Sequence, residues 1–373
     1  MLKFHSLRVV QVQAQAEDAV ALTLDVPAEL ADEYRGVAGQ HVVLRTSLAG
    51  EEVRRTYSLV NTPGERQLRV VARVHSEGRL STHLAHHVRP GDRLDVLPPN
   101  GSFTPHSAAA GRGICVAFAG GCGITPVVSI ARTWLDAGPT GRVILFYGNR
   151  SMARAMCLEE LLALKDSYLD RLALHFVMSR EPQEAAIYNG RLDGGHVRQL
   201  AGPFFAPTEV AEYFVCGPGD MIESVAHALR ELGVPPDRIR AEHFTVATTV
   251  PETSAPDAAR PDTGAAAAAP LGAAPSTEAG LAEVTVIMDG RRRSFTMAMN
   301  GESVLEGAAR AGLELPFSCR AGVCSTCRTK VVRGEVAMNQ NYALEDWELE
   351  QGYVLACQSK VRTPVLELDY DER

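Results

Sequence analysis

A stretch rich in alanine and proline, residues 251–280, divides the chain into two parts of unequal length. It contains eleven Ala, five Pro and three Gly, a single Leu and no aromatic residue. The prolines interrupt any long helix that the alanines favour, and one large apolar side chain cannot form a core. We therefore assign residues 246–282 to a semi-flexible linker with a random-coil span of roughly 30 Å. The residues on either side of it are expected to fold independently.

The composition excludes several classes of protein. With 373 residues, of which 46% are apolar and 22% charged, the chain is globular in composition and long enough for about two to four domains. Its net charge of −8 argues against a nucleic-acid partner, because phosphate binding needs clustered Lys and Arg. Residues 1–20 mix charged with apolar side chains, and no apolar run of about 18 residues follows. We expect a cytoplasmic protein without a membrane span.

Periodicity predicts three domains of different class. Residues 1–103 form short alternating strands separated by turn residues, which favours an antiparallel β-barrel; the expected strands are 7–13, 19–26, 40–46, 52–59, 67–74 and 93–97. Residues 113–245 alternate buried strands with helices, which predicts an α/β unit with a parallel sheet; its expected helices are 126–136, 155–165 and 221–232. Residues 283–373 begin with a hairpin and a helix over 303–311, which predicts a small α+β domain.

Four of the eight cysteines lie in the last domain with a distinctive spacing. Cys319, Cys324 and Cys327 follow the pattern C-x4-C-x2-C, and 29 residues separate Cys327 from Cys357. This is the plant-type spacing of thiolates that hold a [2Fe-2S] cluster. A structural zinc site is the alternative, but zinc ribbons use two C-x2-C pairs and this domain has one. The spacing therefore predicts a [2Fe-2S] cluster.

A glycine-rich turn follows the first strand of the α/β unit. The segment Ala119-Gly-Gly-Cys-Gly-Ile-Thr-Pro126 connects that strand to a helix, so that a pyrophosphate can approach backbone N–H groups at the helix N-terminus. A tight connection without a ligand remains the alternative for this turn by itself.

The next two strands of the unit end in arginine. Arg150 follows one and Arg180 the other, and no Asp or Glu ends the first of them to hold a ribose 2′-hydroxyl. Two guanidinium groups at this edge predict binding of a 2′-phosphate, and hence NADPH. Surface arginines that merely cap the strands are the alternative.

Two segments of the barrel are suited to a second phosphate-bearing cofactor. Arg55 and Tyr57 lie on one face of a strand, with Thr56 and Ser58 on the other. The turn Gly78-Arg-Leu-Ser-Thr82 precedes an expected helix over 82–87, whose N-terminus favours an anion. Each feature is also ordinary strand or helix-cap chemistry.

Together the motifs resemble those of ferredoxin-NADP reductase-like flavoproteins with a ferredoxin appended at the C-terminus. The resemblance covers almost the whole chain and is carried, in order, by Arg55-x-Tyr57-Ser58, Gly78-x-x-Ser81, Gly121-x-Gly123-Ile-Thr-Pro126, Tyr147-Gly-Asn-Arg150 and Cys216-Gly-Pro-x-x-Met221. It implies an antiparallel β-barrel FAD domain, an α/β parallel-sheet NADP domain and a β-grasp ferredoxin domain. The linker is longer and richer in Ala and Pro than is typical of that family.

The resemblance also implies roles for individual residues. In the FAD site, Arg55 binds the diphosphate, Tyr57 packs on the isoalloxazine and Ser58 lies near its N5. The diphosphate is further held by the turn that contains Gly78, Ser81 and Thr82. In the nucleotide site, the dinucleotide lies on Gly121, Gly123 and Thr125. Cys216 is expected beside the nicotinamide, while Glu242 and Phe244 close the flavin site.

This set of cofactors implies an electron-transfer enzyme. Hydride passes from NADPH to FAD, and single electrons then pass through the [2Fe-2S] cluster to a multicomponent oxygenase. Di-iron hydroxylase or epoxidase subunits are the expected acceptor. Reductases of Rieske-type or steroid hydroxylases share these modules and remain an alternative; a non-enzymatic carrier or a zinc-stapled interaction module is the alternative of a different class. The linker would let the ferredoxin domain dock first on the flavin domain and then on the oxygenase. The acidic residues Glu345, Asp346, Glu348 and Glu350 either guide the encounter with the oxygenase or form a solvated helix face.

Overall fold

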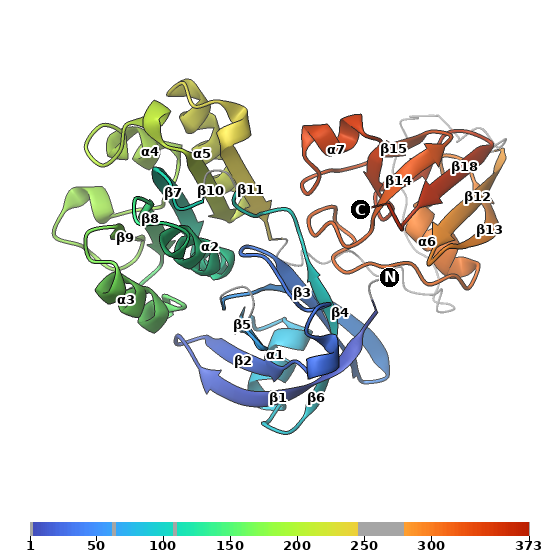
Figure 1. Cartoon of the computed structure of the whole chain (residues 1–373), viewed down its shortest axis with the longest axis horizontal. Coiled ribbons are helices and arrows are strands. Elements are labelled where there is room, and N and C mark those ends of the chain that lie inside the picture. The colour runs from blue at the N-terminus through green and yellow to red at the C-terminus, as the bar shows by residue number, and fades with distance from the viewer. Residues whose placement is uncertain (1–2, 62–64, 107–109, 245–279, 373) are drawn as a thin grey trace, which may run out of the picture.

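The computed structural model describes residues 3–61, 65–106, 110–244 and 280–372, which form three adjoining domains (Figure 1). The fold class expected from the sequence is confirmed: an antiparallel sheet, a parallel sheet and a mixed sheet follow one another along the chain. Most of the predicted linker lies outside the described residues. None of the described helices is long and apolar enough to cross a membrane.

The first domain is a six-stranded antiparallel sheet in the order β4-β3-β6-β1-β2-β5. Its two outer strands are joined through the bridge between Leu59 and Val70, which curls the sheet around an apolar core. The helix α1, which begins at Arg79, packs on this core through Leu80 and Leu84. The elements are β1 (His5–Ala14), β2 (Ala19–Asp25), β3 (His41–Leu48), β4 (Glu51–Ser58), β5 (Gln67–Arg73), α1 (Arg79–His86) and β6 (Arg93–Asn100).

The second domain has a five-stranded parallel sheet in the order β11-β10-β7-β8-β9. Alternate residues of β7 pack against helices on opposite faces: Ala117 lies in the core with α2 and α3, and Phe118 in the core with α4 and α5. The elements are β7 (Ile114–Gly120), α2 (Ile124–Asp136), β8 (Arg142–Asn149), α3 (Leu158–Ser167), β9 (Leu172–Met178), α4 (Gly194–Leu200), β10 (Glu212–Gly217), α5 (Gly219–Glu231) and β11 (Ile239–His243).

The third domain wraps a mixed sheet, in the order β13-β12-β18-β14-β16, around helix α6. Ser303 caps α6: its side chain accepts from the backbone N–H of Glu306, and the Glu306 carboxylate accepts from that of Ser303. The elements are β12 (Leu281–Met288), β13 (Arg291–Ala298), α6 (Val304–Arg310), β14 (Arg328–Arg333), β15 (Val336–Met338), α7 (Asp346–Glu350), β16 (Tyr353–Leu355), β17 (Ser359–Val361) and β18 (Val365–Asp369).

Some boundaries differ from the expected ones for local reasons. Helix α1 begins at Arg79 rather than at residue 82, because Gly78 is its N-cap. Helix α3 begins at Leu158 rather than at residue 155, because Cys157 adopts a left-handed backbone with a φ of 56°. Helix α4 has no counterpart in the sequence prediction, because two glycines, which disfavour a helix, open it after the N-cap Asp193.

Candidate functional site

Strand β4 presents different groups on its two faces, because residues alternate along a strand. Tyr57 is half-buried against the core of the first domain, and burial raises the pKa of its phenol, so the ring stays neutral. Arg55 is exposed on the same face. This places a cation and an aromatic ring where the resemblance expects the flavin.

Ser58, at the end of β4, is buried beside two titratable residues. It pairs across the sheet with His41, whose Nδ1 lies 3.7 Å from Oε1 of Glu242 on β11. The Ser58 hydroxyl, both ring nitrogens of His41 and Glu242 Oε2 are buried without hydrogen-bond partners. Buried polar atoms are normally paired, so this group fits a polar ligand such as the flavin ring. Phe244 packs nearby, against the core shared with the second domain.

The environment of Glu242 predicts a pH dependence of stability. Burial raises the pKa of this carboxyl above its usual value of 4.5, with an opposing effect from His41. The folded state thus binds a proton more tightly than the unfolded state, and its contribution to stability falls as the pH rises above 4.5. We expect Glu242→Gln to flatten the decline of the thermal unfolding midpoint between about pH 5 and 7. The exposed Glu209→Gln is the control; an equal decline in both variants would contradict this assignment.

The first turn of α1 holds its own side chains in place. The Ser81 hydroxyl donates to the Gly78 carbonyl (3.2 Å), and that of Thr82 donates to the His75 carbonyl (3.3 Å). With these hydroxyls engaged, the backbone N–H groups of the first helical turn are the donors left for a diphosphate.

The glycine-rich turn packs tightly on the end of β10. A Cβ on Gly123 would lie 2.1 Å from the carbonyl oxygen of Cys216, so only glycine fits there. Gly121 has a φ of +55° with open space around it. The Thr125 hydroxyl donates to the carbonyl of Cys122, which fixes the turn from inside. Gly121 and Cys122 remain partly exposed at the carboxyl edge of the sheet, where parallel sheets bind dinucleotides.

Tyr147 also supports this turn, and the sequence analysis missed its role. Its hydroxyl donates to the carbonyl of Gly121 (3.1 Å) and accepts from the backbone N–H of Met156 (3.0 Å). Cys216 lies beneath the turn and is fully buried. Burial, followed by the nearby Glu242 and Cys122, holds the pKa of its thiol well above the usual value. Cys216 is therefore a neutral thiol.

The two arginines expected to bind a 2′-phosphate lie side by side. The backbone N–H of Arg180 donates to the carbonyl of Arg150 (2.9 Å), and both residues are exposed beyond the ends of β9 and β8. Glu181, which the sequence analysis did not single out, accepts from the backbone N–H of Met152 (2.8 Å).

The four cysteines of the third domain lie in two pairs. The side chains of Cys319 and Cys324 are in hydrogen-bonding contact, as are those of Cys327 and Cys357. In the part of the chain that the structure describes, no three His, Cys, Asp or Glu side chains converge to hold a single metal ion. Two pairs of thiols suit a cluster of two irons, each bound by two sulfurs, better than one tetrahedral zinc.

The backbone of the cysteine loop is shaped to stabilise thiolates. Contact with Cys324 and with backbone N–H groups, including that of Ala321 (3.3 Å), lowers the pKa of Cys319 to about 5. Arg320, Gly322 and Ser325 all have positive φ, which turns successive N–H groups toward the sulfurs. Gln358, missed by the sequence analysis, ties the loop to Cys357 by donating to the Arg320 carbonyl (2.8 Å). This donor set fits a [2Fe-2S] cluster.

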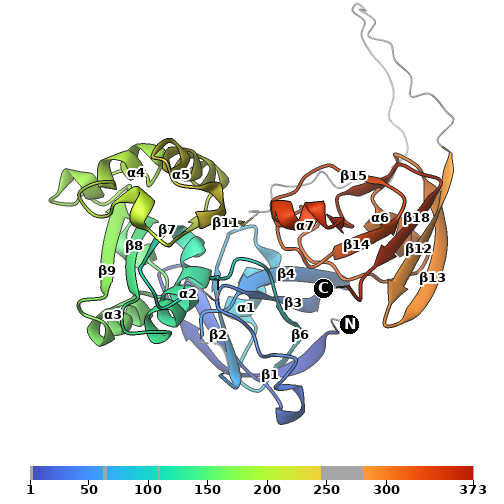
Figure 2. The same cartoon turned by 45° about the horizontal axis from the view of Figure 1, so that its top comes forward.

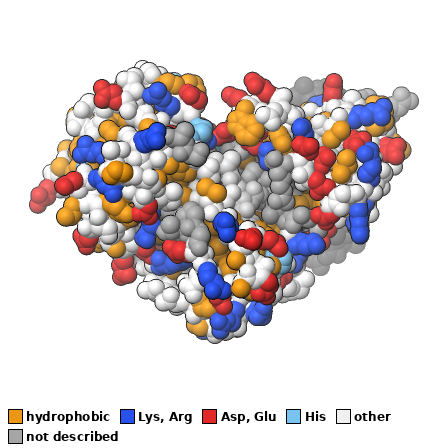
Figure 3. All heavy atoms as spheres, viewed as in Figure 1, with side chains coloured by type: hydrophobic (Ala, Val, Ile, Leu, Met, Phe, Trp, Pro, Cys, Tyr) orange, Lys and Arg blue, Asp and Glu red, His pale blue; other side chains and the backbone are white. Residues whose placement is uncertain are grey.

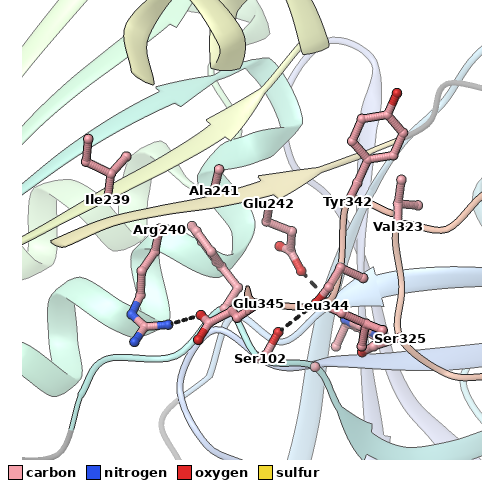
Figure 4. A pocket seen from close by; sticks show the side chains of 14 residues that line it. Ser102, Ile239, Arg240, Ala241, Glu242, Val323, Ser325, Tyr342, Leu344 and Glu345 are labelled. Atoms are coloured by element: carbon pink, nitrogen blue, oxygen red, sulfur yellow. Dashed lines mark hydrogen bonds and ion pairs between the residues drawn. The ribbon is translucent and has the colours of Figure 1, made fainter. Parts of the chain in front are cut away.

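The cysteine loop faces strand β4 and the end of β11. The hydroxyl groups of Thr56 and Ser318 are 2.8 Å apart, which joins the flavin-side strand to the residue before Cys319. A cavity of about 150 Å³ lies between the three domains, lined by residues of all of them, including Glu242 and Ser325 (Figure 4). Figure 2 confirms that β3 and β4 lie beside the third domain.

Family comparisons assign each of the three domains. Residues 6–104 match the oxidoreductase FAD-binding domain, residues 118–227 the oxidoreductase NAD-binding domain, and residues 286–362 the 2Fe-2S iron-sulfur cluster binding domain. The chain thus carries domains for FAD, for a nicotinamide nucleotide and for a [2Fe-2S] cluster.

Full-length relatives have the same organisation. The chain is 36% identical over 100% of its length to a subunit of 1,2-phenylacetyl-CoA epoxidase from Escherichia coli K12, covering 99% of that protein. It is 31% identical over 98% of its length to the ferredoxin reductase component of 3-ketosteroid-9-alpha-monooxygenase from Rhodococcus rhodochrous, covering 96% of it. Phthalate dioxygenase reductase has a similar fold, with a TM-score of 0.56 and 22% identity over 98% of both chains.

These matches agree with the features described above, namely the faces of strand β4, the glycine-rich turn after β7 and the loop with paired cysteines. The chain is an FAD- and nicotinamide-dependent [2Fe-2S] oxidoreductase, and it belongs to the family of ferredoxin-NADP reductase-like proteins, with a C-terminal ferredoxin domain, that serve as reductase components of oxygenases.

Proposed function

We propose that this protein takes electrons from NADPH and passes them through FAD and the [2Fe-2S] cluster to a di-iron epoxidase that acts on phenylacetyl-CoA. The observation that carries the electron path is the contact between Thr56 and Ser318. It joins the strand that bears Tyr57 and Ser58 to the loop that bears Cys319. A short path between flavin and cluster is what single-electron transfer inside one chain requires.

The residues of this chain position and tune the cofactors. FAD, when bound, accepts a hydride and releases single electrons, and the cluster relays them. Arg55, Tyr57 and the α1 turn hold the flavin; Gly121, Gly123 and Thr125 form the platform for the dinucleotide. Ser58 and Glu242 would lie where the two rings meet, with Cys216 buried beneath the neighbouring glycine turn. Because the cluster needs reduced thiolates, a reducing compartment such as the cytoplasm suits this protein.

The preference for NADPH rests on Arg150 and Arg180. Both guanidinium groups are exposed at the carboxyl edge of the sheet and can pair with a 2′-phosphate through charge-assisted hydrogen bonds. Losing such a contact costs about 1.5–3 kcal/mol, or roughly 10- to 150-fold in binding. We therefore expect Arg180→Ala to lower kcat/KM for NADPH by this factor and to leave NADH use nearly unchanged.

The control is Arg230→Ala, which removes an exposed arginine from the end of α5. Steady-state flavin reduction with each nucleotide measures the effect. A wild-type chain that already prefers NADH would show that the two arginines do not select the nucleotide.

The acceptor is tested by reconstitution. The 36% identity to the epoxidase subunit favours a phenylacetyl-CoA epoxidase, and the 31% identity to the steroid monooxygenase component makes a Rieske-type or steroid hydroxylase the second candidate. We expect NADPH-dependent epoxidation of phenylacetyl-CoA when the chain is mixed with the epoxidase subunits. Turnover only with the steroid hydroxylase would overturn the first assignment. Zinc without iron in anaerobically purified protein would support an interaction module instead.

A further inference from the structure

Arg54 on β4 is shared between two domains. It is almost completely buried, with 7% of its surface exposed. Its Nε donates to Glu52 of the same domain (2.7 Å), and its Nη2 donates to Glu314 of the ferredoxin domain (2.6 Å). The ring of Phe317 lies over the guanidinium, 4.1 Å from it. One buried arginine thus holds a carboxylate of its own domain and one of the neighbouring domain.

Arg240 on β11, which lines the cavity between the domains, repeats this arrangement. Its side chain is 9% exposed, and its Nε lies 3.7 Å from Glu212 of the same domain. His106 contacts the same guanidinium. Across the domain boundary, Arg240 forms an ion pair with Glu345, which Figure 4 shows, and Trp347 donates to the other oxygen of that carboxylate (2.8 Å).

The arrangement allows these contacts to break without leaving a buried charge unpaired. A buried charge that loses its only partner is strongly destabilising. Here each arginine keeps a carboxylate of its own domain, Glu52 or Glu212, after the ferredoxin domain leaves. The departing carboxylates are already partly solvated, with side-chain exposures of 69% for Glu314 and 39% for Glu345. The two ion pairs therefore orient the domain but hold it weakly.

The same two carboxylates flank the exit from the cluster. Cys319 is half-buried, whereas the other three cysteines are buried, so the shortest path out of the domain runs through the loop around Cys319. Glu314 precedes this loop, and Glu345 lies beside Leu344 and Ser325 at the cavity. Figure 3 shows acidic side chains along the ferredoxin domain where it faces the α/β domain. An external electron acceptor that approaches this path would contact the same surface of the ferredoxin domain that, in this structure, packs against the flavin side.

We propose that Glu314 and Glu345 form a docking surface that the ferredoxin domain uses twice. It pairs first with Arg54 and Arg240 of this chain and then, after release, with two basic side chains on the oxygenase. At each encounter with the oxygenase, one electron leaves the ferredoxin domain and the oxygenase gains it, with no bond made or broken. This inference rests on the proposed delivery of electrons to an oxygenase.

Two double variants of the full-length holoprotein test the proposal. The double variant Glu314→Gln with Glu345→Gln changes the docking surface of the ferredoxin domain. The double variant Arg54→Gln with Arg240→Gln leaves that surface intact and changes only the arginines that it contacts within this chain. Stopped-flow mixing with NADPH measures the internal step, as bleaching of the cluster absorbance. Mixing the dithionite-reduced chain with the epoxidase subunits measures delivery. Glu350→Gln, which removes the same charge from the exposed end of α7, is the matched control.

We expect the glutamate pair to slow both steps, by roughly threefold to tenfold each, and the arginine pair to slow only the internal step. Rising ionic strength should slow both steps of the wild type. Normal delivery by the glutamate variant would overturn the shared surface. Because Glu314 is exposed and Glu345 is partly solvated, the glutamate variant still tests the proposal even if the buried arginine variants fold poorly. If the wild-type chain reduces its cluster but delivers electrons to no oxygenase, the proposed function is wrong. Electron transfer from flavin to cluster can still be measured in that case, and it still tests both ion pairs.

Discussion

Replacing Cys324 by alanine is expected to remove the cluster while leaving flavin reduction by NADPH intact. Cys324 is buried and pairs with Cys319, so its loss leaves one iron with a single thiolate ligand. Iron and acid-labile sulfide should fall to background, and electron delivery to the oxygenase should fall by more than about 100-fold, since no other one-electron carrier joins the flavin to the outside. Flavin bleaching in stopped flow should keep its wild-type rate.

The matched control is Cys115→Ala, which removes a buried thiol from the parallel sheet. This variant should retain its iron. Full iron content in Cys324→Ala would show that another residue completes the site, and zinc in the wild type would show that the cysteines hold a different metal.

Replacing Gly123 by alanine is expected to disable the nucleotide site. The added Cβ would lie 2.1 Å from the carbonyl oxygen of Cys216 and 2.8 Å from the backbone nitrogen of Gly217. Neither atom belongs to a flexible side chain, so the glycine turn and β10 must separate. We expect a loss of folding stability on the order of 3 kcal/mol and a flavin reduction rate lowered by more than about tenfold.

Gly219→Ala serves as the control, because its new Cβ meets no atom within 4 Å and Gly219 opens a helix. Thermal unfolding and stopped-flow reduction of both variants measure the effects. Wild-type reduction kinetics in Gly123→Ala would show that the turn does not carry the dinucleotide.

The sequence predicts the parts of the site that depend on local pattern. Cysteine spacing, glycine turns and strand alternation are local properties, and the predictions of the cluster ligands, of the nucleotide turn and of the two faces of β4 rest on them. Tyr147 and Gln358 escaped prediction because each acts through a hydrogen bond to a backbone that only the folded chain brings near.

Contacts between domains escaped prediction for a related reason. Arg54 and Glu314 are 260 positions apart, and no periodicity marks either residue. The acidic stretch around α7 was interpreted as a single surface, either a docking patch for the oxygenase or a solvated helix face. The structure separates its members: Glu345 pairs with Arg240 across the domain boundary, Glu348 is buried against Arg328 (2.8 Å), and Glu350 is exposed. A cluster of charges in sequence thus divides into separate structural roles.

The hairpin that joins β3 to β4 restricts how this protein can change in length. Its two turn residues, Ala49 and Gly50, have φ values of 53° and 83°, which are typical of a tight two-residue connection. Beyond the turn, Arg55 and Tyr57 share one face of β4, and Arg54 and Thr56, on the other face, contact the ferredoxin domain. An insertion of one residue early in β4 would exchange the two faces. Homologues should therefore tolerate insertions or deletions of even length within β4 and exclude those of odd length, unless a β-bulge restores the alternation of the two faces.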